Sequence, residues 1–358
     1  MNRPMPRVVH QLVAGFRLGD AISQQALVLQ ALFREWGCAS EIFTEQRRLP
    51  AQDRGRVRDL AALRVAPDDV VLLHLSIGSR ANMLFSQLPC RRVMLSHNMT
   101  PPHFFEGLSE DTAAQLARGI AEAEALAGAV HRALAVSAFN AGELRALGYA
   151  EVGVIPLWLD LDAHGGRPDA GRMRTWSDGR LNVAFVGRVA PNKRFEDLLA
   201  AFYYLKRFVA PDARLLLAGA SNGMERYRDE LIAWTRTLEL EGVEWLGSVS
   251  HAELLAVYGS ADVFLCLSEH EGFCAPLIEA MRHDVPVVAY AAGAVPETLD
   301  GAGVLVREKR FDLLAELIGR LRDDAPLRQA VVARQRERLA RYRAFDFRGA
   351  WRAEIEAV

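Results

Sequence analysis

Short apolar runs alternate with longer helical patterns along most of the chain, and this alternation constrains the fold more than any other feature. The candidate strands are residues 7–13, 40–43, 70–75, 92–96, 132–136 and 152–155, then 181–186, 214–218, 243–246, 262–267, 285–289 and 303–306. Helical patterns fall between them, for example at 20–36 and 109–127. Strands that alternate with helices are typical of a parallel sheet covered on both faces, so we expect a doubly wound α/β architecture.

One interruption of the alternation predicts two domains. Residues 161–179 are rich in glycine, proline and aspartate and lack apolar periodicity, as in a linker. We therefore predict Rossmann-like domains at 1–160 and 180–340. The charged pattern at 341–358 is expected to form a C-terminal helix that packs back on the N-terminal domain. Because ligands of open α/β sheets bind at the carboxyl ends of the strands, we expect the two domains to face one cleft.

Composition excludes several classes of function. The 43 basic and 45 acidic side chains give a net charge near −2, which does not suggest a nucleic-acid binder. The four cysteines form no C-x-x-C pair, so neither a zinc site nor a disulfide framework is expected. The apolar stretch at 8–13 is too short for a signal peptide, and no apolar run reaches the length of a membrane span. These features together predict a cytoplasmic protein.

A basic segment at residues 45–64 leaves two interpretations open. It holds six arginines, at positions 47, 48, 54, 56, 58 and 64, against three acidic residues. The segment is either a solvated loop and helix face or a peripheral contact with the anionic inner face of a membrane.

The loop after the candidate strand at 262–267 carries the densest signal for chemistry. It reads S-E-H-E-G-F-C-A-P-L-I-E-A-M over residues 268–281. Pro276 suits the first turn of a helix, and the N–H groups around Phe273, Cys274 and Ala275 would then be available to a diphosphate. Glu271 and Glu279 would lie before and inside this helix, where their carboxylates can accept hydrogen bonds from sugar hydroxyls.

A second signal follows the candidate strand at 181–186. The strand ends at Gly187, Arg188 comes next, and Lys193 lies at the start of the following helix. Two fixed cations at this edge would stabilise the negative charge of a departing nucleoside diphosphate. No G-x-G-x-x-G motif follows any strand and no P-loop is present, which disfavours a conventional dinucleotide or P-loop site.

The N-terminal domain contributes further candidates. His97 follows a buried strand and can hydrogen-bond a sugar hydroxyl, and His74 is a similar candidate at the end of the preceding strand. Gly19 allows the backbone to approach a phosphate closely. Asp20 either caps the next helix or reaches an acceptor, and Arg17 is a candidate anchor for an anionic acceptor.

The string G-R-x-x-x-x-K, followed about 80 residues later by E-G-F-x-x-P-x-x-E-A-M, resembles the GT4 family of retaining glycosyltransferases. The resemblance covers nearly the whole chain and is most specific at 181–306. It implies a GT-B fold, which consists of two Rossmann-like domains. Cys274 departs from the family pattern, because a glycine is common at its position.

The resemblance also implies roles for individual residues. Glu271 would contact the transferred hexose and Glu279 the ribose, while Arg188 and Lys193 would hold the diphosphate. His97 would lie at the reactive face of the sugar, and Gly19 under the phosphates. The backbone near Ser248 and Val249 would frame the base. Further donor-binding positions implied by the motif are Gly187, Gly272, Phe273, Cys274, Ala275 and Leu277. The resemblance also implies an enzyme that needs no metal or other cofactor.

The sequence thus predicts a retaining transferase that moves a hexose from a UDP- or GDP-sugar to a sugar, lipid-linked or small-molecule acceptor. Synthesis of cell-envelope polysaccharide or glycoconjugates is the expected context. Two alternatives remain at this point. One is a nucleotide-sugar epimerase of similar two-domain shape, which needs an additional acid/base pair. The other is a non-catalytic protein that only binds nucleotide sugars.

Overall fold

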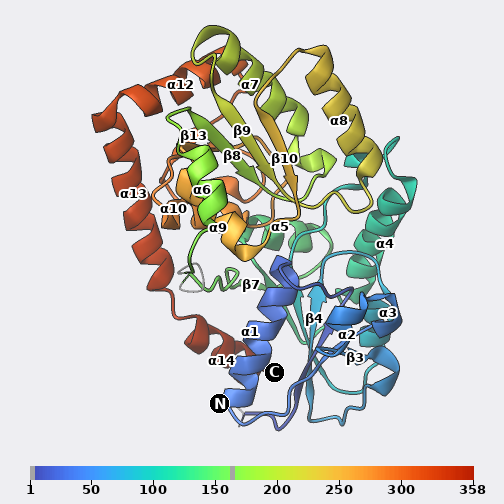
Figure 1. The fold of residues 1–358 in the computed structure, drawn as a ribbon. Coiled ribbons are helices and arrows are strands. Elements are labelled where there is room, and N and C mark those ends of the chain that lie inside the picture. The colour runs from blue at the N-terminus through green and yellow to red at the C-terminus, as the bar shows by residue number, and fades with distance from the viewer. Residues whose placement is uncertain (1–4, 162–165) are drawn as a thin grey trace. The chain divides into compact units, whose positions relative to one another are not determined.

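The computed structural model describes residues 5–161 and 166–358, and these residues form two compact units. The N-terminal unit comprises Met1–His103, Glu110–Leu159 and Asp346–Val358, and the C-terminal unit comprises Phe104–Ser109 and Asp160–Phe345. Each unit contains one fully parallel sheet with helices around it (Figure 1). The predicted α/β fold with two doubly wound domains is confirmed.

In its described residues, the N-terminal unit contains a seven-stranded sheet of order β3-β2-β1-β4-β5-β6-β7. The strands are β1 (Val9–Val13), β2 (Ile42–Thr44), β3 (Arg58–Asp59), β4 (Val70–Leu75), β5 (Arg91–Ser96), β6 (Arg132–Ala135) and β7 (Val152–Val154). The helices are α1 (Ala21–Glu35), α2 (Ala51–Arg54), α3 (Arg80–Ser86), α4 (Glu110–Leu126), α5 (Ala138–Ala146) and α14 (Phe347–Glu356). Every residue of β4 is buried, because this strand lies inside the sheet and both of its faces are covered.

The C-terminal unit has a six-stranded sheet of order β10-β9-β8-β11-β12-β13 in the part of the chain described. Its strands are β8 (Asn182–Val186), β9 (Arg214–Ala218), β10 (Val243–Gly247), β11 (Val263–Cys266), β12 (Val287–Tyr290) and β13 (Val304–Val306). Its helices are α6 (Ala170–Trp176), η5 (Pro191–Lys193), α7 (Phe195–Phe208), α8 (Glu225–Thr237), α9 (His251–Ser260), α10 (Ala275–Arg282), α11 (Val295–Leu299), α12 (Phe311–Asp323) and α13 (Ala325–Arg343).

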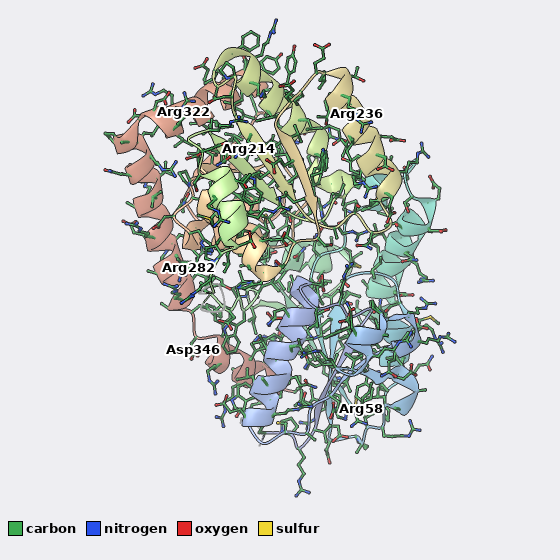
Figure 2. The ribbon with its side chains drawn as sticks, viewed as in Figure 1. Arg58, Arg214, Arg236, Arg282, Arg322 and Asp346 are labelled. Atoms are coloured by element: carbon green, nitrogen blue, oxygen red, sulfur yellow. The ribbon has the colours of Figure 1, made fainter. Side chains whose placement is uncertain are left out.

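The stretch predicted as a linker contains a folded part. Residues 162–165 lie outside the described residues, but α6 belongs to the C-terminal unit. Trp176, only 1% exposed, anchors this helix and donates from Nε1 to Glu244 at 3.1 Å. Arg214, labelled in Figure 2, lies at the start of β9 and pairs with Asp178 at 2.7 Å. The composition of this stretch predicted a linker, because one tryptophan by itself produces no apolar periodicity. The burial of Trp176 nevertheless holds α6 against the C-terminal unit.

The C-terminal helical pattern divides into three helices, and the last of them belongs to the N-terminal unit. Asp346, labelled in Figure 2, caps α14 by accepting from the N–H of Gly349. Trp351 of α14 is fully buried against Phe33 of α1, with ring centroids 6.4 Å apart, and the two helices lie side by side in Figure 1. Arg132 of β6 pairs with Glu354 on the same helix.

Candidate active site

The C-terminal sheet reverses its strand order between β8 and β11, and both predicted motifs lie in the loops that follow these two strands. Connections from neighbouring strands leave in opposite directions at such a reversal, which opens a crevice at the carboxyl ends of the strands. The two motifs therefore meet at the place where an open α/β sheet binds its ligands.

A buried ion pair joins the two loops. Lys193 Nζ lies 2.6 Å from Glu271 Oε2, with the side chains 21% and 7% exposed respectively. Burial has the largest single effect and lowers the pKa of Lys193, but the charge and hydrogen bond of Glu271, together with the nearby Cys274 and Cys266, outweigh it, so the pKa of the lysine is raised. The ammonium group therefore stays charged at neutral pH.

The backbones of the same loops are tied together by Asn192. Its side-chain Nδ2 donates to the carbonyl of His270 at 2.9 Å, and its own carbonyl accepts from the N–H of Glu269 at 2.8 Å. Sequence reasoning missed Asn192. Its only signal was its place between Arg188 and Lys193 in the second motif.

Helix α10 begins at Ala275, as the proline pattern predicted. Its N-cap, Cys274, has a left-handed backbone with φ of 64° and makes no side-chain capping bond, so the first N–H groups of the helix have no such acceptor. The left-handed φ explains why the GT4 pattern has a glycine here. Thr298 donates to the carbonyl of Phe273, and Leu277 is fully buried beneath the turn.

Gly293 supports the loop from the other side. An added Cβ at this glycine would lie 2.4 Å from the carbonyl oxygen of Glu271, and its φ is +55°. The next residue, Ala294, donates its N–H to the same carbonyl at 2.9 Å. The backbone of Glu271 can lie where it does only because residue 293 has no side chain.

Glu279 lies one turn inside α10 and accepts a hydrogen bond from the hydroxyl of Tyr258 at 2.6 Å. Burial, followed by the charge of Glu279, raises the pKa of Tyr258 well above its usual range. Tyr258 therefore remains a donor that holds the carboxylate in place. It was not among the sequence candidates.

A second charged cluster lies beside the first. Lys309 Nζ contacts Asp197 at 2.6 Å and Glu269 at 2.8 Å, and it lies 4.5 Å from the centroid of the Tyr290 ring. Arg194 pairs with the same two carboxylates. Arg194 therefore faces this cluster, whereas its neighbour Lys193 faces Glu271.

The remaining C-terminal candidates lie at loops after strands. Arg188 is exposed, and its Nη2 donates to the carbonyl of Asn222 at 3.3 Å. Gly187 is packed tightly, since a Cβ on Gly219 would lie only 1.8 Å from its carbonyl oxygen. Ser248 is exposed and Val249 is half-buried, immediately after β10.

In the N-terminal unit, the loop from β1 to α1 is exposed from Arg17 to Asp20. Gly19 has a φ of +86°, and Asp20 caps α1 by accepting from Ser23 N–H at 3.0 Å. Of the two roles predicted for Asp20, the structure shows the helix cap. The N–H of Arg17 donates to Ser23 Oγ, which keeps the turn compact.

A chain of hydrogen bonds orients His97. Gln11 Nε2 donates to the carbonyl of Ala26, so its Oε1 must accept from His74 Nε2, 2.9 Å away. His74 Nδ1 is then left to accept from His97 Nε2 at 2.8 Å, and His97 Nδ1 carries the free lone pair. His74 is 0% exposed, so it lies behind His97 and cannot itself touch an acceptor.

Both rings of this chain are neutral. Burial lowers the pKa of His74 to about 3. Burial, followed by the repulsion that a protonated His74 would exert, lowers the pKa of His97 well below its usual range. Sequence reasoning selected both histidines but not Gln11, which fixes their tautomers.

One group of described residues has atoms spaced to hold a metal ion. Cys266, Glu271 and Cys274 are all buried, and their ligand atoms lie within 4.8 Å of one another. The two Sγ atoms are 3.9 Å apart. The sequence suggested scattered thiols because it contains no C-x-x-C pair, but the turn after β11 brings these two cysteines together.

Arg47, Arg48 and Arg58 of the basic segment at 45–64 form ion pairs within the N-terminal unit. Arg47, Arg48 and Arg80 all contact the carboxylate of Glu45. Arg58, labelled in Figure 2, pairs with Glu41 at 3.6 Å. Among the described helices, none is both long and apolar enough to cross a bilayer. Contact of this segment with a membrane stays a prediction.

Comparison with known families identifies the C-terminal unit. Residues 172–338 match the family model described as glycosyl transferases group 1. The predicted glycosyltransferase family is therefore confirmed for this segment, which matches group 1 glycosyl transferases, and the chain has the predicted GT-B fold.

Two curated relatives each match less than half of the chain. The GDP-mannose-dependent alpha-mannosyltransferase of Mycolicibacterium smegmatis is 38% identical over 149 residues, which are 41% of this chain and 33% of that protein. A D-inositol 3-phosphate glycosyltransferase of Corynebacterium diphtheriae is 35% identical over 151 residues, 41% of this chain and 35% of the relative. The chain thus spans about a third of the length of each of these relatives.

Solved structures share the fold over nearly the full length. Sucrose-phosphate synthase from Thermosynechococcus elongatus has a TM-score of 0.72 at 20% identity, with 94% of each chain covered. HepE from Anabaena, solved with UDP-glucose, has a TM-score of 0.71 at 19% identity, covering 97% of this chain and 98% of that one. At such identities the likeness shows the fold alone.

Proposed function

We propose that this protein is a retaining glycosyltransferase that transfers a hexose from a UDP- or GDP-sugar to a sugar, lipid-linked or small-molecule acceptor. The observation that carries the proposal is the Lys193–Glu271 ion pair at the reversal point of the C-terminal sheet, beside the start of α10. A cation, helix N–H groups and a carboxylate in one pair of loops match a nucleotide sugar, which presents a diphosphate and several hydroxyls.

In the proposed complex, the diphosphate lies against the N-terminus of α10. An ammonium group has three donors, so Lys193 can keep one hydrogen bond to Glu271 and give another to a phosphate oxygen. Arg188 supplies the second cation. Glu279, held by Tyr258, accepts from the ribose hydroxyls, and the backbone at Ser248 and Val249 frames the base.

The proposed reaction breaks the bond between the anomeric carbon and the diphosphate oxygen. Negative charge grows on the leaving diphosphate, where Lys193, Arg188 and the α10 N–H groups stabilise it. Glu271 interacts with the hexose as its ring gains positive charge. The acceptor oxygen attacks from the same face and gives its proton to the departing oxygen, so the configuration is retained. Protein cations take the part that a metal ion plays in other transferases, and no cofactor is needed.

The N-terminal unit is proposed to bind the acceptor. The free lone pair on His97 Nδ1 can accept a hydrogen bond from a sugar hydroxyl, and Gly19 leaves the backbone of its turn open to a phosphate group. Arg17, exposed beside it, is the proposed anchor for an anionic group on the acceptor. Binding of a sugar with an anionic group fits a role in the synthesis of cell-envelope polysaccharide or glycoconjugates. The proposed location is the cytoplasm, at or near the membrane.

The experiment is a screen of UDP- and GDP-hexoses, first by thermal protection and then by transfer to simple sugar acceptors. GDP-mannose is the first donor to test, because one relative is named for its dependence on it. Tight-binding donors raise the melting temperature by mass action. We expect a product that keeps the anomeric configuration of the donor by NMR, formed at the same rate after EDTA treatment.

The same screen separates the alternatives. An epimerase would convert the donor to a second sugar nucleotide without any acceptor. A binding protein would be protected by donors but would turn none of them over. An inverted linkage, or activity that is lost with EDTA and restored by magnesium, would refute the retaining, metal-independent mechanism.

A further inference from the structure

Two buried thiols meet directly beneath the proposed hexose site. Cys266 is the last residue of β11 and is fully buried, and Cys274 caps α10 with 8% exposure. Their Sγ atoms are 3.9 Å apart, and Cys266 also donates to Ser268 Oγ at 3.4 Å. Neither thiol has a part in the proposed transfer reaction.

Glu271 completes this group, which we call the thiol–carboxylate cluster. The two Sγ atoms and one carboxylate oxygen lie within 4.8 Å of one another, on three buried residues. Two thiolates bound tetrahedrally to zinc at about 2.3 Å would be about 3.8 Å apart. The observed separation of 3.9 Å therefore requires almost no movement of the cysteines.

The chemistry of the cluster selects the kind of cation. Two sulfur ligands and one oxygen ligand suit zinc or cadmium, whereas magnesium and calcium prefer oxygen ligands alone. Three protein ligands leave a fourth position for water or a hydroxyl group. On binding, the two thiols would release two protons, so affinity should rise with pH.

A cation at this position competes with Lys193. The lysine ammonium lies 2.6 Å from the same carboxylate, and two positive charges cannot share it at low cost. Lys193 is one-fifth exposed and has a flexible side chain, so it can move away. The metal would then remove both the cation and the carboxylate from the proposed donor site.

We propose that Cys266, Cys274 and Glu271 form an inhibitory site for a thiophilic divalent cation such as Zn²⁺. The site goes beyond the proposed function, because it assigns a ligand and a means of inhibition to two thiol groups that transfer does not use. Removal of metal leaves the enzyme active, whereas occupation blocks the donor site.

The first test measures binding without any enzyme assay. Metal-free protein is titrated with Co²⁺, which gives an intense charge-transfer absorption when thiolates coordinate it. We expect one Co²⁺ per chain with this absorption, and loss of the absorption in Cys266→Ser and in Cys274→Ser. Cys90→Ser is the matched control, since Cys90 is also buried but lies in the other unit. Absence of the band from the wild type, or its loss in Cys90→Ser alone, would refute the site.

The second test measures inhibition by Zn²⁺. Wild-type transfer should be inhibited, restored by EDTA and protected by excess donor. Without added metal, Cys266→Ser should transfer at a near-normal rate. Half-inhibition of this variant should need a Zn²⁺ concentration about tenfold or more above that for the wild type, since even loss of an outer-shell partner weakens metal binding by that factor. Equal inhibition of Cys266→Ser and wild type would overturn the proposed inhibition. If no transfer activity exists, the Co²⁺ titration still decides whether the site binds metal, so the two proposals can fail separately.

Discussion

At the scale of single residues, the two glutamates of the β11–α10 segment should have separable roles. The ribose changes little as the glycosidic bond breaks, so Glu279→Ala should raise the donor KM and the nucleotide Kd by about tenfold or more. The hexose gains charge only at the transition state, so Glu271→Gln should lower kcat by roughly 100-fold and leave the Kd of the bare nucleoside diphosphate nearly unchanged.

Calorimetry with nucleotide and steady-state kinetics measure both effects. Tyr258→Phe is the matched control for Glu279, because it removes only the hydrogen bond that holds the carboxylate. It should show a smaller change in the same direction as Glu279→Ala. Equal loss of nucleotide binding in both glutamate variants would contradict the assignment of Glu279 to the ribose and Glu271 to the hexose.

Lys193 and Arg194 provide a second test at this scale. Lys193→Ala removes the buried cation and should slow transfer by roughly 100-fold, as Arg188→Ala should. Arg194→Gln is the matched control, because Arg194 faces Asp197 and Glu269 instead. Its rate should stay close to wild type. Near-normal rates in Lys193→Ala and Arg188→Ala would mean that these cations do not act on the diphosphate.

At the scale of elements, the loop before α10 depends on the turn before α11. Gly293→Ala would place a Cβ 2.4 Å from the carbonyl of Glu271 and should displace this loop. A misplacement of about 1 Å can cost roughly 100-fold in rate, so we expect a loss of that order in kcat/KM.

Gly301→Ala is the control for this loop. Gly301 also has a positive φ, of +80°, but nothing lies within 4 Å of an added Cβ. The Gly301→Ala substitution should lower the free energy of unfolding by about 1–2 kcal/mol and leave kcat unchanged. Urea unfolding and kinetics on both variants separate backbone strain from loop displacement. An active Gly293→Ala enzyme would show that the position of Glu271 is not critical.

At the scale of the whole molecule, the neutral histidine pair predicts how stability depends on pH. In the unfolded chain each histidine binds a proton below about pH 6.5, but in the fold His74 has a pKa of about 3 and that of His97 is also lowered. The unfolded state then binds more protons, so stability should fall as the pH drops below about 6.5.

The variant His74→Gln isolates this effect, since glutamine cannot bind a proton. Its unfolding midpoint in urea should decline less steeply than that of the wild type between about pH 6.5 and 5, even if it is less stable at neutral pH. Parallel declines of the two proteins would show that the pair is not neutral in the fold.

The positions of most strands along the chain and the two C-terminal motifs could be predicted from the sequence alone. Strands such as β4 and β9 lie at the predicted residues, because buried parallel strands are continuous apolar runs between helical patterns. The loop position of Lys193 and Glu271 follows from the same alternation, since a residue after a strand must lie at the carboxyl edge of the sheet. The roles assigned to these residues stay predictions.

Only the tertiary structure decided which side chains meet. The Lys193–Glu271 pair spans two strand–loop units, and the contacts of Asn192 and Gly293 depend on how those loops lie against each other. Cys266 and Cys274 have no metal-binding spacing, yet the left-handed turn at Cys274 brings their sulfur atoms together. Local patterns determine elements because hydrophobic periodicity is a property of neighbouring residues. Distances between loops are set by sheet order and packing, which no local pattern encodes.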